Sequence, residues 1–337
     1  MDSTGQSDSV SQLGGTGQPP QQAGEKDLIV RVFLNSNEVR SGWRLLIFLF
    51  LFAANSIIIS ALGRGLARAS AHHFSPLALV TGDGLALLAL LVATLIMAAL
   101  ERRSFSDYGL PWRRAFQAQF WSGALWGWAA LTLLLLLIRL YRGFDFGWLA
   151  LRSWKGLLYY AAVWALAFLV VGFFEEFFFR GYALYTLASG MGFWPAAIVL
   201  SVAFGLVHLH NPGEDLTGGI AAALIGLFFC FTVRRTGTLW FAIGLHSLWD
   251  YCETFVYAVP DSGMVARGHL LNSRLHGPGW LTGGAVGPEG SLFVFIVVVN
   301  LFIVLHLVYP KARYPKPKTS LQGMRPASHR FKGASQA

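Results

Sequence analysis

Three short stretches of apolar sequence carry side chains that could activate water. The first reads EEFFFR and holds Glu175, Glu176 and Arg180 within six residues. Each ionisable group in a membrane helix costs about 2.5 to 3.5 kcal/mol on insertion scales, so such a cluster predicts a functional site. Glu176 and Arg180 have the i, i+4 spacing and order of an intrahelical ion pair, which leaves Glu175 without a local partner. The alternative is an architectural ion pair beside a glutamate that reaches the lipid headgroups.

Two further stretches place polar residues four positions apart. FGLVH contains Phe204 and His208, and HSLWD contains His246 and Asp250 on one helical face. A lone histidine such as His208 is often an interfacial residue, but two polar groups on one face of an apolar helix need a partner across the bundle. A carboxylate or imidazole near water can act as a general base, and hydrogen-bond donors can stabilise a tetrahedral oxyanion.

Composition places these stretches in a membrane. Of the 337 residues, 55% are hydrophobic and only 13% are charged, which is more apolar surface than one soluble core needs. The net charge of +9 could suggest nucleic acid, but most Lys and Arg lie in short stretches between apolar runs. We therefore expect a lipid bilayer and no nucleic acid among the partners.

The apolar runs predict an all-α, polytopic membrane protein with about eight transmembrane helices, since a span needs about 20 apolar residues. The expected spans are 43–62, 77–100, 118–138, 157–188, 195–210, 218–233, 238–258 and 291–309. The fourth is too long for an upright span, so it should tilt, kink or extend past Arg180. His210 falls at a helix boundary, beside Asn211 and Pro212.

Polar segments flank this bundle, which we expect over 41–310. Residues 1–40 form a polar N-terminal tail whose first 24 residues cannot bury enough surface to fold, and no signal-peptide pattern begins the chain. Residues 311–337 form a basic tail. Segment 259–290 is rich in Gly and Pro and should be a long loop, either functional or disordered. The two cysteines, Cys230 and Cys252, have no paired spacing and should be packing residues.

The distribution of basic residues predicts the orientation. With eight helices, the side that holds both termini carries 17 Lys and Arg, and the opposite side carries 8. The positive-inside rule therefore predicts that both termini are cytoplasmic. Seven of the 17 come from the C-terminal tail alone.

Counting residues along the predicted helices brings the three motifs to one depth. Glu175 lies 13 residues before the expected end of its helix, and His208 lies 13 residues after the expected start of the next. His246 and Asp250 lie 8 and 12 residues into theirs, which is roughly 12 to 18 Å at 1.5 Å per residue. All four side chains can therefore converge in one layer.

The ordered motifs EExxxR, FxxxH and HxxxD resemble the CAAX protease and bacteriocin-processing family, which includes the type II CAAX prenyl endopeptidases. ERRSFSDYGLP at 101–111 and RTGTLWFAIGLHSLWDY at 235–251 also resemble bacterial members. The resemblance is strong over about 155–258 and weak over the first three helices. It implies a multi-pass intramembrane endopeptidase, in a bacterial plasma membrane, that acts on membrane-associated, possibly prenylated, proteins or peptides.

The resemblance also implies roles for the motif residues. Glu175 would be the general base, His208 would share or orient the water, and Glu176 with Arg180 would hold the helix geometry. His246 and the residue at 250 would stabilise the oxyanion. The prenyl endopeptidases carry asparagine where this chain has Asp250, and an aspartate donates a hydrogen bond only when protonated. As a carboxylate, Asp250 would instead orient His246 and favour its charged form.

Other interpretations remain open at this stage. Glu175, His208 and His246 together resemble a catalytic zinc site, although no HExxH helix is present, so the cofactor is either none or a divalent metal such as zinc. We prefer metal-free glutamate catalysis. A proton-coupled transporter would also use buried Glu, His and Asp, but no inverted repeat is visible. The third alternative is a catalytically silent scaffold or immunity protein of the same fold.

Overall fold

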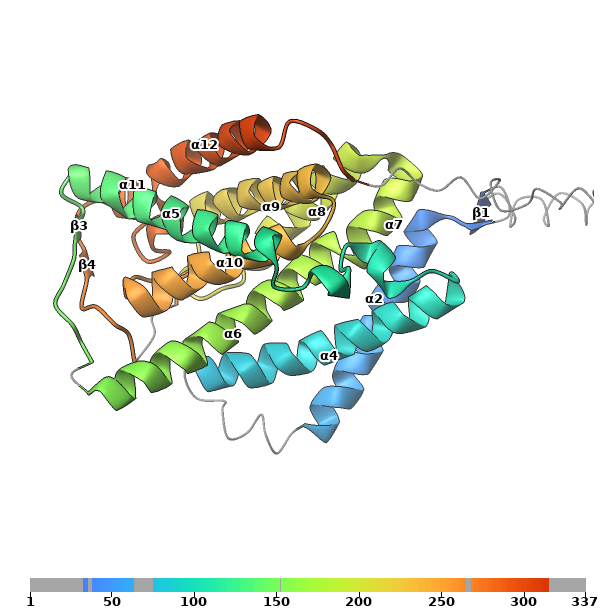
Figure 1. Cartoon of the computed structure of the whole chain (residues 1–337), viewed down its shortest axis with the longest axis horizontal. Coiled ribbons are helices and arrows are strands. Elements are labelled where there is room, and N and C mark those ends of the chain that lie inside the picture. Colours follow the sequence, from blue (N-terminus) through green and yellow to red (C-terminus); the bar gives the residue numbers. More distant parts are fainter. Residues whose placement is uncertain (1–32, 36–37, 64–74, 152, 265–267, 315–337) are drawn as a thin grey trace, which may run out of the picture.

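The structure, a computed structural model, describes residues 33–35, 38–63, 75–151, 153–264 and 268–314. The expected disordered residues 1–24 and most of the basic tail, from 315 onward, lie outside these ranges. The described chain is mostly helical, as predicted, with only short strands. Most of the helices, among them α4, α6, α9 and α12, run roughly along the long axis of the molecule, whereas α2 crosses it steeply (Figure 1).

Every apolar run that was predicted to be a transmembrane helix forms a helix. The principal helices are α2 (Ser41–Leu62), α4 (Pro76–Leu100), α5 (Ala118–Leu140), α6 (Trp154–Arg180), α7 (Tyr182–Met191), α8 (Phe193–His208), α9 (Leu216–Thr236), α10 (Trp240–Tyr251) and α12 (Leu292–Val308). Short polar side chains set several starts. Ser75 accepts a hydrogen bond from the amide of Ala78 at α4, and Asp215 accepts one from Gly218 at α9.

Length and composition make five of these candidates for spanning a membrane: α2, α4, α5, the α6–α7 unit (Trp154–Met191) and α9. The apolar helices α8 and α12 have 16 and 17 residues, and α10 has 12, which is less than the roughly 20 that a span needs. The number of spans is therefore supported only in part. Exposed leucines and isoleucines on α2 and α12 would contact lipid, as in an integral membrane protein.

The fourth predicted helix is interrupted, as its excess length predicted. α6 ends at Arg180, and α7 begins at Tyr182 after a break at Gly181. A Cβ atom at Gly181 would lie 2.3 Å from the carbonyl oxygen of Phe177, so the break needs a residue without a side chain. The break ends α6 directly after the EEFFFR motif.

α10 lies at the centre of the bundle because small residues let α5 approach it closely. Cβ atoms at Gly123 and Gly127 of α5 would lie 2.0 and 2.1 Å from the carbonyl oxygens of Phe241 and Leu245 on α10. Small residues four positions apart allow such backbone contact between membrane helices. Almost the whole of α10 is buried, including His246 and Asp250.

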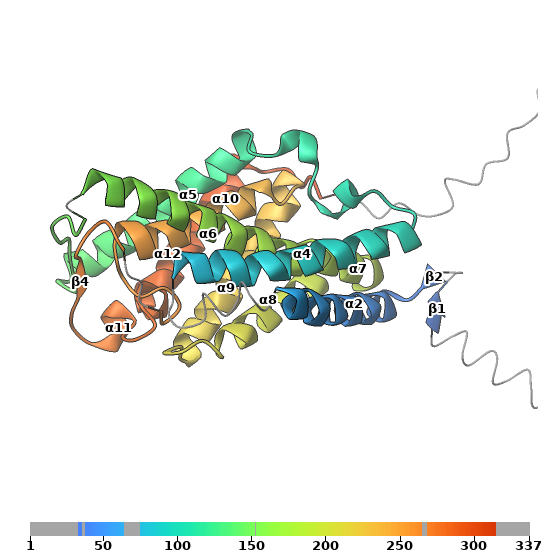
Figure 2. The same ribbon diagram turned by 90° about the horizontal axis from the view of Figure 1, so that it is seen from below.

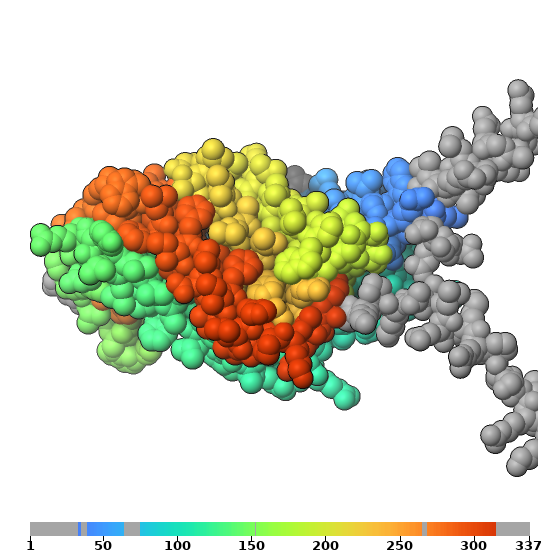
Figure 3. Space-filling view, turned by 90° about the horizontal axis from the view of Figure 1, so that it is seen from above, coloured from blue at the N-terminus to red at the C-terminus, as the bar shows by residue number. Residues whose placement is uncertain are grey.

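α12 and the segment before it cover one side of α10. α12 packs on α5 and α9 and crosses the molecular surface between them (Figure 3). The helix of α10 widens into a π-helical turn, Cys252–Val256, and the described residues between 257 and 291 then fold over that end of the bundle. Within this segment β4 (Arg274–Leu275) pairs with β3 (Phe144–Asp145), and α11 spans Gly279–Thr282. In its described residues the predicted loop is thus ordered into turns and short elements.

Candidate active site

Glu176 and Arg180 form a fully buried ion pair on α6. Arg180 Nη1 donates to Glu176 Oε1 at 3.1 Å, and both side chains are 0% exposed. The i, i+4 pairing expected from the sequence is therefore present. Because both charges are buried, removal of either partner would leave the other uncompensated.

Aromatic rings surround the guanidinium of Arg180. Its Cζ atom lies 4.4 Å from the centroid of the Phe204 ring and 5.3 Å from that of Phe229. A Cβ atom at Gly226 would lie 2.7 Å from Arg180 Nη2, so this glycine makes room for the cation. Cation–π contacts of this kind are worth about 2 kcal/mol when desolvated. Three helices, α6, α8 and α9, thus meet at Arg180.

His246 on α10 contacts carboxylates through both ring nitrogens. Its Nδ1 lies 3.0 Å from Glu176 Oε1, the oxygen that also accepts from Arg180. Its Nε2 lies 3.4 Å from Asp250 Oδ2 and 3.8 Å from Glu175 Oε2. Because a carboxylate paired with arginine only accepts hydrogen bonds, Nδ1 carries the proton of that bond. His246 is therefore oriented by Glu176, and its Nε2 faces Glu175 and Asp250.

His208, the last residue of α8, has one ring nitrogen fixed by the backbone. Its Nδ1 lies 2.9 Å from the carbonyl oxygen of Phe204, which can only accept, so Nδ1 donates. The imidazole also packs against the Phe204 ring, with centroids 4.3 Å apart. When His208 is neutral, this leaves the lone pair of Nε2 free to accept a proton or a hydrogen bond.

One cavity of about 210 Å³ joins these side chains. Glu175, His208, His246 and Asp250 all line it, so the four residues predicted to converge lie around a single space. Glu176 and Arg180 lie behind it, where they hold His246 and the aromatic rings. The cavity can hold water and part of a peptide chain.

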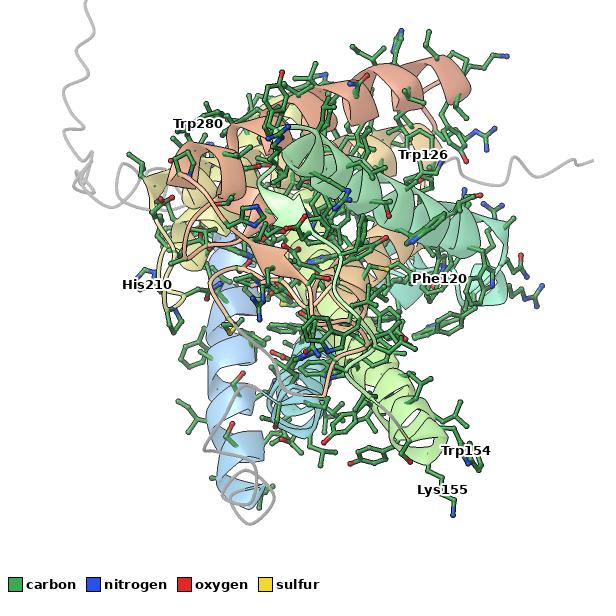
Figure 4. The ribbon with its side chains drawn as sticks, turned by 90° about the vertical axis from the view of Figure 1, so that its left-hand side faces the viewer. Phe120, Trp126, Trp154, Lys155, His210 and Trp280 are labelled. Atoms are coloured by element: carbon green, nitrogen blue, oxygen red, sulfur yellow. The ribbon has the colours of Figure 1, made fainter. Side chains whose placement is uncertain are left out.

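His210 provides an internal comparison. Its Nδ1 also approaches the carbonyl oxygen four residues earlier, at 3.1 Å from Leu206, but its side chain is exposed and does not line the cavity. Figure 4 shows His210 at the edge of the molecule. The boundary position predicted for His210 is therefore correct.

Sequence analysis missed three carboxylates in the cavity wall. Asp83 of α4, Asp261 and Glu289 line it together with the predicted residues. Asp261 and Glu289 come from the segment expected to be a long loop, where acidic residues carry no helix-spacing signal. For Asp83 a signal existed, since it is the single ionisable residue of α4.

Asp261 and Glu289 belong to a small acidic group beside the cavity. Among the described residues, Glu253, Asp261 and Glu289 alone place three candidate metal-ligand atoms within 4.8 Å of one another. Trp249 Nε1 donates to both Glu253 Oε2 and Glu289 Oε1, at 2.9 Å each. Thr254 donates to Asp261 at 2.8 Å. Neutral donors thus hold this group together.

The predicted zinc set does not have this compactness. Glu175, His208 and His246 are not a group of mutually close ligand atoms in the described structure. The other nitrogen of the His246 ring, Nε2, also faces a fourth residue, Asp250, at 3.4 Å. As these side chains stand, they do not fit around one metal ion, and we derive no step through a metal.

Two loop carboxyl groups near the cavity hold protons more tightly than usual. Burial, followed by repulsion from Glu289, raises the pKa of Glu214 to about 7. Burial, followed by the charges of Asp250 and Glu289, raises the pKa of Asp261 well above its usual value. The loop side of the cavity is therefore crowded with carboxyl groups, and these two retain protons at a higher pH than free side chains do.

Comparison with known proteins identifies the same part of the chain. No curated protein and no solved structure matches the chain. The family model described as "type II CAAX prenyl endopeptidase Rce1-like" matches residues 157–252, which run from α6 to α10 and contain all six motif residues. The match confirms the resemblance drawn from the motifs: over residues 157–252 the chain is similar to the Rce1-like type II CAAX prenyl endopeptidase family.

Proposed function

We propose that this protein is an intramembrane endopeptidase that hydrolyses peptide bonds of membrane-associated proteins or peptides without a metal ion. The observation that carries the proposal is the convergence of Glu175, His208, His246 and Asp250 on one cavity within the Rce1-like segment. The family supports a protease, and the apolar helices support a substrate that reaches the site from the bilayer.

Glu175 acts as the general base in this proposal. Its Oε2 atom faces His246 Nε2 at 3.8 Å and accepts no hydrogen bond from the described protein. The side chain is 25% exposed and lines the cavity, so a water molecule there can reach the carboxylate. His208 holds the same water through Nε2, because its Nδ1 is committed to the backbone. The base removes a proton while the water oxygen attacks the scissile carbonyl carbon.

In this proposal His246 stabilises the oxyanion by donating a hydrogen bond. Glu176 fixes its ring through Nδ1, so a proton on Nε2 points toward the cavity, where negative charge develops on the carbonyl oxygen. Preorganised donors of this kind are worth about 3 to 4 kcal/mol of transition-state stabilisation each. Asp250 lies 3.4 Å from Nε2 and favours the protonated ring, or donates directly when it is itself protonated.

The cavity wall also bears on the substrate. Its described lining residues include Asp83, Glu175, Asp250, Asp261 and Glu289, and none of them is Lys or Arg. A neutral or cationic peptide segment therefore suits it better than one with additional carboxylates. A prenylated CAAX-type protein is one candidate substrate, and an unprenylated membrane peptide is another.

Two rival functions are separated by the same chemistry. A proton-coupled transporter would move a solute across the membrane and leave peptides intact. A silent scaffold would bind a partner and be indifferent to the loss of Glu175. A silent scaffold does not explain why a carboxylate without a hydrogen bond at Oε2 and an imidazole with one fixed nitrogen face the same cavity. A transporter would use the same groups, so peptide cleavage is the observation that separates it from a protease.

The experiment compares peptides from the membranes of cells that express the wild type, Glu175→Ala, His208→Ala or His210→Ala. We expect cleavage products in the wild type and His210→Ala, and their absence in the first two variants at equal levels of inserted protein. His210→Ala is the matched control, because it removes an imidazole two residues from His208 that lies outside the cavity. Identical profiles in all four strains would contradict proteolysis.

A further inference from the structure

Asp83 is an ionisable residue that the proposed mechanism has not used. It lies in α4, an apolar helix of 25 residues whose only charged side chain it is. Insertion of a carboxylate near the centre of a membrane helix costs about 2.5 to 3.5 kcal/mol, so an unpaired one has a functional explanation by default. No ion pair of the described residues includes Asp83.

The packing of α4 directs Asp83 into the candidate active site. α4 runs along α6 (Figures 1 and 2). Leu79 and Asp83, four residues apart on one face of α4, both line the cavity that contains Glu175. The site therefore has one carboxyl group on each of two adjacent helices.

Hydrolysis of an amide bond needs an acid as well as a base. The nitrogen of the departing amine is a poor leaving group unless it receives a proton as the C–N bond breaks. In the proposed mechanism Glu175 has already accepted a proton from water, and the His246 ring, which Glu176 orients, serves the oxyanion. Among the described lining residues, Asp83 is a carboxyl group from an element that otherwise supplies no chemistry to the site.

We propose that Asp83 is a catalytic residue, the general acid that protonates the leaving amine nitrogen. This inference rests on the proposed function. Water gives one proton to Glu175 and its oxygen to the carbonyl carbon. The C–N bond then breaks, its electron pair stays on nitrogen, and the proton of Asp83 joins that nitrogen. Transfer of the proton from Glu175 to Asp83 through water restores both groups, so one water and one peptide bond yield one acid and one amine.

The surroundings favour a starting state in which Glu175 is ionised and Asp83 carries the proton. Carboxylates that share one cavity repel each other, and this repulsion favours a proton on some of them. Glu175 Oε2 lies 3.8 Å from His246 Nε2, which is a source of positive charge when the ring is protonated. Asp83 has no cationic partner among the described residues, which favours its neutral form.

The test compares two probes that differ in leaving group. The first is a lipid-tethered peptide with the sequence of a Glu175-dependent cleavage from the membrane comparison, and the second is the p-nitrophenyl ester of its acyl side. Nitrophenolate leaves without a proton, whereas an amine does not. Each is assayed with wild type, Asp83→Asn and Glu175→Gln in liposomes.

Asp83→Asn should lose about 100-fold or more on the peptide, in line with general acid catalysis, and less than about threefold on the ester. The ratio of the two rates in one preparation does not depend on the fraction of folded protein, so partial misfolding of the variant cannot imitate this result. Glu175→Gln should lose both activities.

Equal losses of Asp83→Asn on the two probes, or undiminished peptide cleavage, would overturn the role of Asp83 and leave the proposed function standing. Undiminished peptide cleavage by Glu175→Gln would instead overturn the proposed function, and the proton donor with it. Asp83→Glu keeps the carboxyl group, and its peptide-to-ester ratio should lie closer to that of the wild type than the ratio of Asp83→Asn does.

Discussion

His246 Nδ1 and Arg180 Nη1 lie 3.0 and 3.1 Å from the same oxygen atom, Oε1 of Glu176. The second residue of the EEFFFR motif therefore joins the cation of its own helix to the histidine of α10. Through this shared oxygen the buried ion pair fixes the orientation of the His246 ring, which lines the cavity. Glu176 and Arg180 are positioning residues for His246 as well as an architectural pair.

Arg180→Ala should lower both folded yield and activity. The change leaves the fully buried Glu176 carboxylate with the His246 ring as its remaining partner, and loss of one partner of a buried ion pair costs about 3 to 5 kcal/mol. The measurement is thermal unfolding in detergent. The matched control is Arg139→Ala, whose pair with Asp145 is 3.3 Å long but 47% and 67% exposed and so contributes about 1 kcal/mol at most. Equal unfolding temperatures for the two variants would show that the buried pair is dispensable.

Asp250→Asn should keep activity within about tenfold of the wild type near neutral pH. An asparagine amide donates to the oxyanion permanently, and its oxygen can still accept from His246 Nε2, which lies 3.4 Å from the present carboxylate. Proteolysis by the two proteins is compared with and without a chelator. A loss above about tenfold, or roughly 1.4 kcal/mol of barrier, would rule out a simple donor role. Chelator-sensitive activity restored by zinc would overturn metal-free catalysis.

Stability should fall as the pH rises from about 5 to 8, partly because of Glu214. Its pKa is raised to about 7, so the folded protein holds a proton there that the unfolded chain has already released. That contribution is present below the ordinary glutamate range and is lost as the pH passes about 7. Glu214→Gln should flatten the dependence of the unfolding temperature on pH. Asp145→Asn removes an exposed carboxylate and should leave the slope unchanged; equal slopes in Glu214→Gln and wild type would refute the assignment.

The orientation in the membrane can be read from single cysteines. If both termini are cytoplasmic, His276→Cys, between α10 and α12, should react with an impermeant maleimide in intact cells. Lys311→Cys, beyond α12, should react only after permeabilisation. Both native residues are exposed, and Cys230 and Cys252 are buried, which limits background labelling. The reverse pattern would place the termini outside.

The sequence sufficed to predict the helices and the convergence of the motif residues, because hydropathy and i, i+4 spacing are local properties. It did not predict that Glu176 would contact His246, since this depends on how closely the glycines of α5 let α10 approach and how α10 packs on α6. Asp83 stands out in the sequence as the single ionisable residue of α4, but it has no partner at helical spacing, so only the packing of α4 on α6 shows which site it joins. Likewise, the fold of segment 257–291 brings Asp261 and Glu289 to the cavity, and no periodic pattern encodes that fold.

The central claim is most directly tested with purified protein in liposomes, by the initial rate at which wild type and Glu175→Gln cleave the lipid-tethered peptide. Glutamine retains the shape of the side chain but cannot accept a proton from water. We expect the variant to lose at least about 100-fold in rate, the lower range for a general base, with the unfolding temperature unchanged within a few degrees. Equal rates for the two proteins would contradict the account.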